Sequence, residues 1–478
     1  MFKINNSSFN PILLMLGFLS GITIFSFSSC ATVNYYYRGR WTEEIEILTQ
    51  KPKESFPPAS FIVMNDLHLF STELGTDGPA FQQYIEDDRK LIEESELILK
   101  AALQQVIEKD PDFLMIPGDL AKDGELYNHT LLAEYLNQVE EHGIEVYVIP
   151  GNHDILNPHA HSYHEEGFSP IETVTPQDFR RIYSRFGYEE ALFTDPSSLS
   201  YVAEPVPGLW LLALDSCIYD KNLKKGKPET DGRFEQLRID WIEEVLLTAL
   251  RENKTVIAMQ HHGALEHYPG QQKFYGEYII EDYSRIAEMF ATYNVNVVFT
   301  GHYHAQDITL NKREGEREKF LYDIETGSLV TWPCPYRHVE LTEEGLLMIR
   351  SYNIEEIEGF PRGDETFSQY AHRYLLEGIA GIAVNTMEKL GVKTEEAKRI
   401  SPKVAEAFAA HYRGDENFEG DTMLPTEGLS LMGSIVVCNR KDLIFGLWQD
   451  KPPVDNNIII NLRNGEWKPL EEPVASLR

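Results

Sequence analysis

The stretch FIVMNDLH at residues 61–68 decides the fold that we predict for this 478-residue chain. Phe61 to Met64 are apolar, which is typical of a buried strand, and the polar side chains of Asp66 and His68 follow directly. Four more stretches repeat this pattern of an apolar run followed by a polar cluster: FLMIPGD (113–119), VYVIPGNHD (146–154), VIAMQHH (256–262) and VNVVFTGHYH (295–304). Because ligand sites of parallel α/β sheets lie at the carboxyl ends of strands, the five clusters predict a single site.

The residue types in these clusters favour a centre with two metal ions. Two cations about 3.5 to 4 Å apart can clamp a phosphoryl group and convert a shared water into hydroxide near neutral pH. Asp119 stands alone after its strand, with a glycine before it, and is the natural carboxylate to bridge them. Asp66 and His68 are two residues apart at a strand end, so their side chains should point to the same side and share one ion. The same spacing holds for His302 and His304.

Asn152 and one histidine of the pair His261 and His262 complete the set of candidate ligands. The set then holds two carboxylates, four imidazoles and one amide carbonyl. Such a mixture of oxygen and nitrogen ligands suits Fe, Mn or Zn better than Ca or Mg. A single aspartate or histidine at a strand end is usually a turn residue, but turn chemistry does not explain five such clusters in succession.

The five clusters resemble, in order, the motifs DxH, GD, GNHD, H and GHxH of the calcineurin-like metallophosphoesterase superfamily. This resemblance implies an α/β fold in which two mixed β-sheets pack face to face and are flanked by helices. It also implies how the two metal ions share their ligands: Asp66, His68, Asp119 and His304 at the first, and Asp119, Asn152, His261 and His302 at the second. Family members with a single histidine in the fourth motif align with His261, which we therefore prefer to His262.

The resemblance further implies two catalytic residues in the third cluster. His153 is expected to act as the general acid or charge stabiliser for the leaving oxygen, and Asp154 to orient it. Purple acid phosphatases, one branch of the superfamily, have a tyrosine ligand three residues after the bridging aspartate, where this chain has Lys122. That branch is therefore not expected. Three longer segments resemble bacterial secreted or lipoprotein cyclic-nucleotide phosphodiesterase-like proteins: 118–125, 148–158 and 179–191.

The function expected from these motifs is metal-dependent hydrolysis of a small phosphodiester, with a 3′,5′-cyclic nucleotide as the favoured substrate and a metal-bridging hydroxide as the nucleophile. A phosphomonoesterase, or a glycerophosphodiester or nucleotide hydrolase, could use the same centre. An alternative of another class is a lipoprotein that binds a ligand without catalysis. The complete ligand set favours the enzyme, because a chain that had lost catalysis would be expected to have lost at least one ligand.

The first thirty residues predict export. Lys3 gives a basic start, an apolar stretch covers 11–27, and small residues precede Cys30. This pattern is typical of a secretory signal, and the cysteine makes it resemble a bacterial lipoprotein signal. We expect Cys30 to be lipidated and to anchor an exported lipoprotein to a membrane, in the periplasm or on the cell surface. An uncleaved anchor is the alternative.

Composition limits the remaining possibilities. The chain has 43 basic and 76 acidic residues, a net charge of −33, which argues against binding of duplex nucleic acid. Three cysteines besides Cys30 give no disulfide framework.

Apolar residues recur at helical spacing over 88–109, 126–141, 234–250, 278–290, 365–390 and 404–411, the last opened by Ser401 and Pro402. We expect a signal peptide at 1–30, a tether at 31–58, a catalytic domain at 59–352 and a small, mainly helical C-terminal domain at 353–478.

Overall fold

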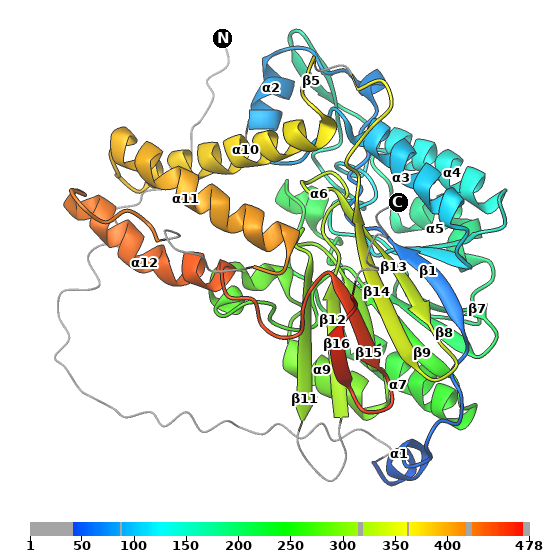
Figure 1. Cartoon of the computed structure of the whole chain (residues 1–478). Helices are drawn as coiled ribbons and strands as arrows, with labels where there is room; N and C mark the ends of the chain where they lie inside the picture. The colour runs from blue at the N-terminus through cyan, green and yellow to red at the C-terminus, as the bar shows by residue number, and fades with distance from the viewer. Residues whose placement is uncertain (1–41, 87, 314–318, 361–362, 417–422, 472–478) are drawn as a thin grey trace, which may run out of the picture. The chain divides into compact units, whose positions relative to one another are not determined.

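The computed structural model describes residues 42–86, 88–313, 319–360, 363–416 and 423–471, all of which belong to one compact unit. Two seven-stranded sheets form its centre (Figure 1). The first has the order β16-β15-β14-β13-β1-β2-β3. Its strands are β1 (Ala59–Val63), β2 (Phe113–Ile116), β3 (Glu145–Val148), β13 (Pro335–Leu341), β14 (Leu346–Asn353), β15 (Asn457–Asn461) and β16 (Glu466–Pro469). β1, β2 and β3 are parallel, whereas β13 is antiparallel to β1.

The second sheet has the order β11-β12-β10-β9-β8-β7-β6. Its strands are β6 (Phe193–Thr194), β7 (Tyr201–Val206), β8 (Leu209–Leu214), β9 (Thr255–Gln260), β10 (Val297–Thr300), β11 (Asp307–Arg313) and β12 (Lys319–Glu325). The two sheets pack face to face: the ring of Phe61 on β1 lies edge-on to that of Phe299 on β10, with centroids 5.5 Å apart. Strands covered on both faces are apolar throughout, which explains why these runs do not alternate.

Helices cover the outer faces of both sheets. Residues of α3 (Ser95–Lys109) and α4 (Leu126–Glu140) join the core of the first sheet, and residues of α7 (Gln236–Arg251) and α9 (Tyr283–Thr292) join that of the second. Shorter elements lie in the connections: α2 (Pro79–Glu86), α5 (Pro176–Ile182), α6 (Asn222–Lys225), α8 (Gln271–Tyr275) and the hairpin of β4 (His161–His164) and β5 (Gly167–Pro170). The predicted fold of two packed mixed sheets flanked by helices is confirmed.

The predicted tether contains a helix. Residues Thr42–Thr49 form α1, and Ile45 is buried in the same apolar cluster as Ile242 and Leu246 of α7. The Arg251 guanidinium adds a hydrogen bond of 2.8 Å to the carboxylate of Glu44. The chain is therefore fixed to the second sheet well before β1 begins. The predicted signal, Cys30 and the first part of the tether lie outside the described residues.

The C-terminal region has three long helices, α10 (Phe367–Lys389), α11 (Thr394–Arg413) and α12 (Leu431–Leu447). α11 begins at Thr394 and carries Pro402 in its interior, so the prediction that Pro402 opens this helix is corrected. The packing of Ala397 and Ile400 against Met387 of α10 accounts for the earlier start, because it offsets the backbone hydrogen bond that a proline cannot donate. Among the described helices, none is long and apolar enough to cross a membrane.

The last two strands return to the first sheet. β15 pairs antiparallel with β14, with Ile349 opposite Ile458, and its alternate residues Ile458 and Ile460 are buried. The described part of the region after residue 353 therefore consists mainly of three long helices, followed by two strands of the central sheet. The domain boundary at 353 stays a prediction.

Candidate metal centre

All seven predicted ligands meet at one place, where β1, β2, β3, β9 and β10 end. One side-chain atom each from Asp66, His68, Asp119 and His304 lies within 4.8 Å of the others, and the same holds for Asp119, His261 and His302. Asp119 belongs to both groups. The amide oxygen of Asn152 lies 3.1 Å from Nε2 of His261 and so joins the second group. The structure thus brings the ligands together in the two sets that the family resemblance implies.

The ligands reach this place through left-handed turns rather than through strand alternation. β1 ends at Val63 and β10 at Thr300, so the ligands that follow lie in loops. Five of the seven have positive φ: Asp66 (49°), His68 (39°), Asp119 (50°), His302 (75°) and His304 (69°). Such angles are uncommon for residues other than glycine and tend to cluster at functional sites. Strand parity predicts that each pair lies on one side, and this holds for Asp66 and His68, which share a group, but not for His302 and His304, which lie in different groups.

Glycines let these loops approach one another. A Cβ atom on Gly151 would overlap the backbone nitrogen and the carboxylate of Asp119, and one on Gly301 would overlap the side chain of Asn65. Asn65 holds the turn in place, because its amide nitrogen donates to the Thr300 carbonyl at 2.8 Å and its amide oxygen accepts from the Asp66 N–H at 3.0 Å. The turn after β1 is thereby joined to the end of β10.

The first group brings imidazole nitrogens and carboxylate oxygens to one point. Nε2 of His68 lies 3.3 Å from Nε2 of His304 and 3.5 Å from Oδ2 of Asp119. Oδ1 of Asp66 lies 3.5 Å from Nε2 of His304. Burial lowers the pKa of both His68 and His304, which favours neutral rings with a free lone pair. Oδ1 of Asp66 is buried and has no hydrogen-bond partner among the described residues.

The second group is oriented by backbone carbonyls. Nδ1 of His261 donates to the Pro117 carbonyl at 3.0 Å, which leaves its Nε2 to face Oδ2 of Asp119 at 3.5 Å. Nε2 of His302 donates to the Thr230 carbonyl at 3.1 Å, which leaves its Nδ1 as the lone-pair atom. A hydrogen bond of this kind to the far ring nitrogen is the usual support of a metal-binding histidine.

His262 occupies a supporting position. Its Nδ1 lies 2.7 Å from the hydroxyl of Ser216, and its Nε2 lies 2.9 Å from the carbonyl of Thr230. Both ring nitrogens are therefore engaged by protein atoms, whereas Nε2 of His261 faces Asn152 and Asp119. This geometry favours His261 as the ligand of the pair.

His153 lies beside the first group with its ring partly exposed. Its Nδ1 is 2.8 Å from the Lys122 carbonyl and 3.0 Å from Oδ1 of Asp123, so this nitrogen donates and Nε2 is left for substrate. Its ring lies edge-on to that of His68, with centroids 4.9 Å apart. Burial lowers the pKa of His153, but the carboxylates of Asp119 and Asp123 outweigh it and raise the pKa above its usual value.

Asp154 has a different task from the one that the resemblance implies. Its carboxylate accepts hydrogen bonds from the backbone N–H groups of Gly151 at 2.7 Å, Leu120 at 2.9 Å and Ala121 at 3.0 Å. It therefore joins the loop after β3 to the loop after β2, and the contact expected of it with the His153 ring is made by Asp123. The physical reason is that a fully buried carboxylate needs several donors, which the two turns supply.

Sequence reasoning missed two charged groups at this site. Asp123 stands four residues after the bridging Asp119 in the segment GDLAKDGE, so a carboxylate search around His153 could have found it. Lys90 is buried and pairs with Asp88 at 3.2 Å, and its charge lowers the pKa of His68 after the larger effect of burial. No motif contains Lys90, and nothing in its sequence position connects it to the site.

Comparison with known proteins identifies the arrangement. A sequence model of the calcineurin-like phosphoesterases matches residues 59–306, which is more than half of the chain and includes every candidate ligand. The chain belongs to the calcineurin-like phosphoesterase family. It is accordingly a metallophosphoesterase, a hydrolase of phosphoric esters. No curated protein matches the chain.

Several solved structures are similar to this chain at low identity. A dimetal phosphatase from Danio rerio has 13% identity and a TM-score of 0.42, with 62% of this chain and 96% of that chain covered. A purple acid phosphatase from yellow lupin, Lupinus luteus, has 11% identity and a TM-score of 0.39, with 63% and 52% covered. The NAD nucleotidase of Haemophilus influenzae has 12% identity and a TM-score of 0.33, with 63% and 50% covered.

The residues present fit the dinuclear metal centre of the family. Asp66 has a buried carboxylate oxygen without a partner among the described residues, and two imidazole nitrogens face each other at 3.3 Å beside it. In the second group, burial disfavours the charged form of His261, yet Asp119 raises its pKa to about 9. A proton on His261 thus balances Asp119 when no other cation does, and a metal ion would take over that role.

Proposed function

We propose that this chain is a metal-dependent phosphodiesterase that hydrolyses a small phosphodiester. The observation that carries the proposal is the position of Asp119, whose carboxylate is shared by both ligand groups. A shared carboxylate holds two cations at the separation that clamps one phosphoryl group. His153 stands next to this carboxylate, since its backbone N–H donates to Oδ1 of Asp119 at 2.9 Å.

Two metal ions, Fe or Mn with Zn as a further choice, match the mixed donor set. Asp66, His68, Asp119 and His304 would hold one, and Asp119, Asn152, His261 and His302 the other. When bound, the ions supply positive charge to the phosphoryl oxygens and lower the pKa of coordinated water. The protein's own contribution is to hold outer atoms of the ligands: Nδ1 of His261 donates to Pro117, Nε2 of His302 donates to Thr230, and Oδ2 of Asp66 accepts from the His302 N–H.

His153 is the proton donor in this proposal. Its Nδ1–H is held by Asp123, whose carboxylate also favours the imidazolium, so Nε2–H is free to face the leaving oxygen. A protonated donor near neutral pH suits an alkoxide leaving group, which is too basic to depart without a proton. His153 touches the substrate, whereas Asp123 acts through His153 and is a positioning residue.

The first experiment is turnover of bis-p-nitrophenyl phosphate by the full chain supplied with Mn²⁺. We expect hydrolysis that disappears with a chelator and returns with the metal. p-Nitrophenyl phosphate, run in parallel, tests the phosphomonoesterase alternative, and a panel with 3′,5′-cyclic nucleotides tests the substrate that the sequence resemblance favours. A chain that retains two metal ions and hydrolyses none of these esters would contradict the proposal and favour a binding lipoprotein.

We also propose that Cys30 carries a lipid that anchors the protein to a membrane, on the evidence of the basic start, the apolar stretch and the small residues before the cysteine. Cys30→Ser should then move the protein from the detergent phase to the aqueous phase in a phase-separation assay. A chain that starts at Thr32 should keep full activity, because every candidate ligand lies between residues 66 and 304. Unchanged partitioning of Cys30→Ser would refute the anchor.

A further inference from the structure

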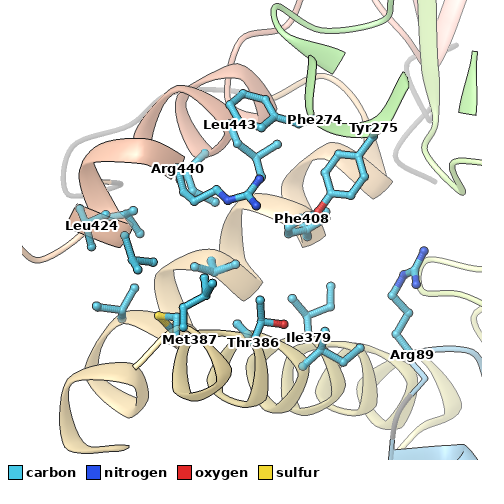
Figure 2. A pocket seen from close by; sticks show the side chains of 18 of the residues that line it. Arg89, Phe274, Tyr275, Ile379, Thr386, Met387, Phe408, Leu424, Arg440 and Leu443 are labelled. Carbon is cyan, nitrogen blue, oxygen red and sulfur yellow. The ribbon is translucent and has the colours of Figure 1, made fainter. Parts of the chain in front are cut away.

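A cavity of about 400 Å³ lies between the three C-terminal helices and the segment 274–278 (Figure 2). It adjoins the metal centre. The ring of Tyr278 lines it and also packs on the ring of the metal ligand His302, with centroids 4.5 Å apart. Tyr303, which lies between His302 and His304 in the chain, lines the cavity as well. The turn that carries two metal ligands is therefore also a wall of this cavity.

The cavity is lined by aliphatic and aromatic side chains. Ile379 and Met387 come from α10, and Leu443 and Ile444 from α12, while Phe408 of α11 is one of the rings in the wall. Tightly packed interiors rarely leave voids of this size, because apolar walls without neighbours forfeit packing energy. A volume of about 400 Å³ instead lies within the range of small-molecule sites, roughly 300 to 1,000 Å³. The lining thus favours an apolar occupant.

The charges around the cavity are opposite to those of the chain. Although the protein has 76 acidic residues, none of the described residues that line the cavity is acidic, and two are arginines. Arg89 lies at one end and Leu424 at the other (Figure 2). Nε of Arg89 donates to the hydroxyl of Tyr412 at 2.7 Å, which fixes the guanidinium at the cavity wall. The end that holds Arg89 therefore suits an anionic group.

The cavity opens beside an exposed apolar side chain. Leu390 lines it and is 45% exposed. Thr386 and Arg440, also in the lining, are exposed to solvent. The cavity is therefore accessible to a hydrocarbon chain from the solvent side.

We propose that this cavity binds the aliphatic chain of an amphiphilic phosphodiester whose phosphate lies at the metal centre. The inference rests on the proposed phosphodiesterase function and names its substrate class: an ester with one long alkyl group. A nucleobase could stack on the aromatic rings of the lining, but its edge would meet only arginine, tyrosine and threonine side chains there, because the described lining contains no amide or carboxylate side chain.

A series of p-nitrophenyl alkyl phosphodiesters, from methyl to dodecyl, tests this inference with the full chain and Mn²⁺ below the micellar concentration of each ester. We expect kcat/KM to rise about three- to fourfold per added methylene until the cavity is full. Thr386→Trp should fill the cavity and lower the ratio of octyl to methyl rates by roughly tenfold. Asn385→Trp is the matched control, since Asn385 is the exposed neighbour of Thr386 and does not line the cavity. Its ratio should equal that of the wild type.

A binding measurement separates this inference from the proposed function. Metal-free protein should bind dodecyl phosphate in a calorimetric titration, more tightly than butyl phosphate by at least 100-fold, and Thr386→Trp should weaken the longer ligand alone. Turnover of the methyl ester without any dependence on chain length would overturn the cavity assignment and leave the phosphodiesterase standing. Failure to hydrolyse any ester, with tight binding of dodecyl phosphate retained, would overturn the proposed function and leave the cavity assignment.

Discussion

The metal centre and the helical cavity share the turn at residues 301–304 but are stabilised in different ways. The metal centre consists of buried polar side chains whose positions are fixed by hydrogen bonds to backbone groups, such as the three N–H groups that bind Asp154. The cavity is lined mainly by aliphatic and aromatic side chains, and part of its rim faces solvent. In our proposal, the residues at the strand ends therefore carry out the hydrolysis, and the cavity between the helices selects among ester substrates. Substitutions in the first region should therefore lower the rate for every ester, and those in the second should change the preference among esters.

The largest effect is expected from the pair His261 and His262. His261→Gln removes a candidate metal ligand. The loss of the metal's stabilisation of the transition state, worth several kcal/mol, should lower the rate on bis-p-nitrophenyl phosphate by roughly 10³- to 10⁵-fold. His262→Gln removes only a supporting contact and should cost about 10-fold to 100-fold. Measuring the steady-state rate and the metal content of both variants compares the two losses. Equal losses for the two would contradict the assignment of His261 as the ligand.

The next effect separates metal binding from proton transfer. His153→Ala should keep the metal ions and slow an ester with an alkoxide leaving group by on the order of 10² to 10⁴. An ester with a p-nitrophenolate leaving group needs little protonation and should lose far less. His159→Ala, a nearby exposed histidine, is the control and should behave as the wild type. Similar losses on both esters would show that His153 is not the acid.

A smaller effect concerns stability at the junction of β11 and the C-terminal region. Burial raises the pKa of Glu416 and of Asp455 well above the usual range, and Asp307 adds to both. A carboxyl group whose folded pKa is raised stabilises the fold below its unfolded pKa, and this contribution is lost as the pH rises through the folded pKa. The free energy of unfolding should therefore fall as the pH rises above about 4.3, by at most about 1.4 kcal/mol per pH unit for each group.

Chemical denaturation between pH 5 and 8 measures that dependence. Glu416→Gln should flatten it, because the amide cannot titrate, whereas Glu427→Gln, at an exposed position, should leave it unchanged. A slope that Glu416→Gln does not alter would refute the contribution of Glu416.

The smallest effect concerns the helices alone. The hydroxyl of Thr366 caps α10 by accepting from the backbone N–H of Gln369 at 3.3 Å. Thr366→Ala should lower the free energy of unfolding by about 1 kcal/mol, and Thr366→Ser should restore it. The rate on a methyl ester should stay at the wild-type level, because Thr366 touches neither the metal centre nor the cavity lining. A large loss of rate in Thr366→Ala would show that α10 also positions the metal ligands.

The two regions also differ in how well sequence alone predicts them. The clustering of the candidate ligands was predictable because metal chemistry restricts residue types and parallel strands restrict position, so that residues such as Asp66 and His302 could be picked out from their motifs. The hydrogen bonds of the Asp154 carboxylate could not be predicted. Their donors include the backbone N–H groups of Leu120 and Ala121, which almost any residue at these positions would supply. Helix α12 was missed for a local reason: Gly433, Gly446 and a run of β-branched residues give it poor intrinsic helix propensity, and tertiary packing stabilises it instead.

The cavity could not be predicted from the sequence either. Its walls come from α10, α11 and α12 and from Arg89 and Tyr278, which are far apart in the chain and belong to no motif. Apolar residues at helical spacing predict that a helix is buried on one face, but they do not show whether that face meets another helix tightly or leaves a space. Packing between distant segments decides this, and only the structure shows it.

The metal content of the Asp119→Ala variant tests the central claim most directly. Elemental analysis of the purified full chain, after loading with Mn²⁺ and removal of excess metal, should give two ions per wild-type molecule. Because Asp119 is shared by both ligand groups, Asp119→Ala should retain less than one ion and lose hydrolysis of bis-p-nitrophenyl phosphate, while its circular dichroism stays that of the wild type. A folded Asp119→Ala protein that keeps two ions and near wild-type turnover would contradict the account.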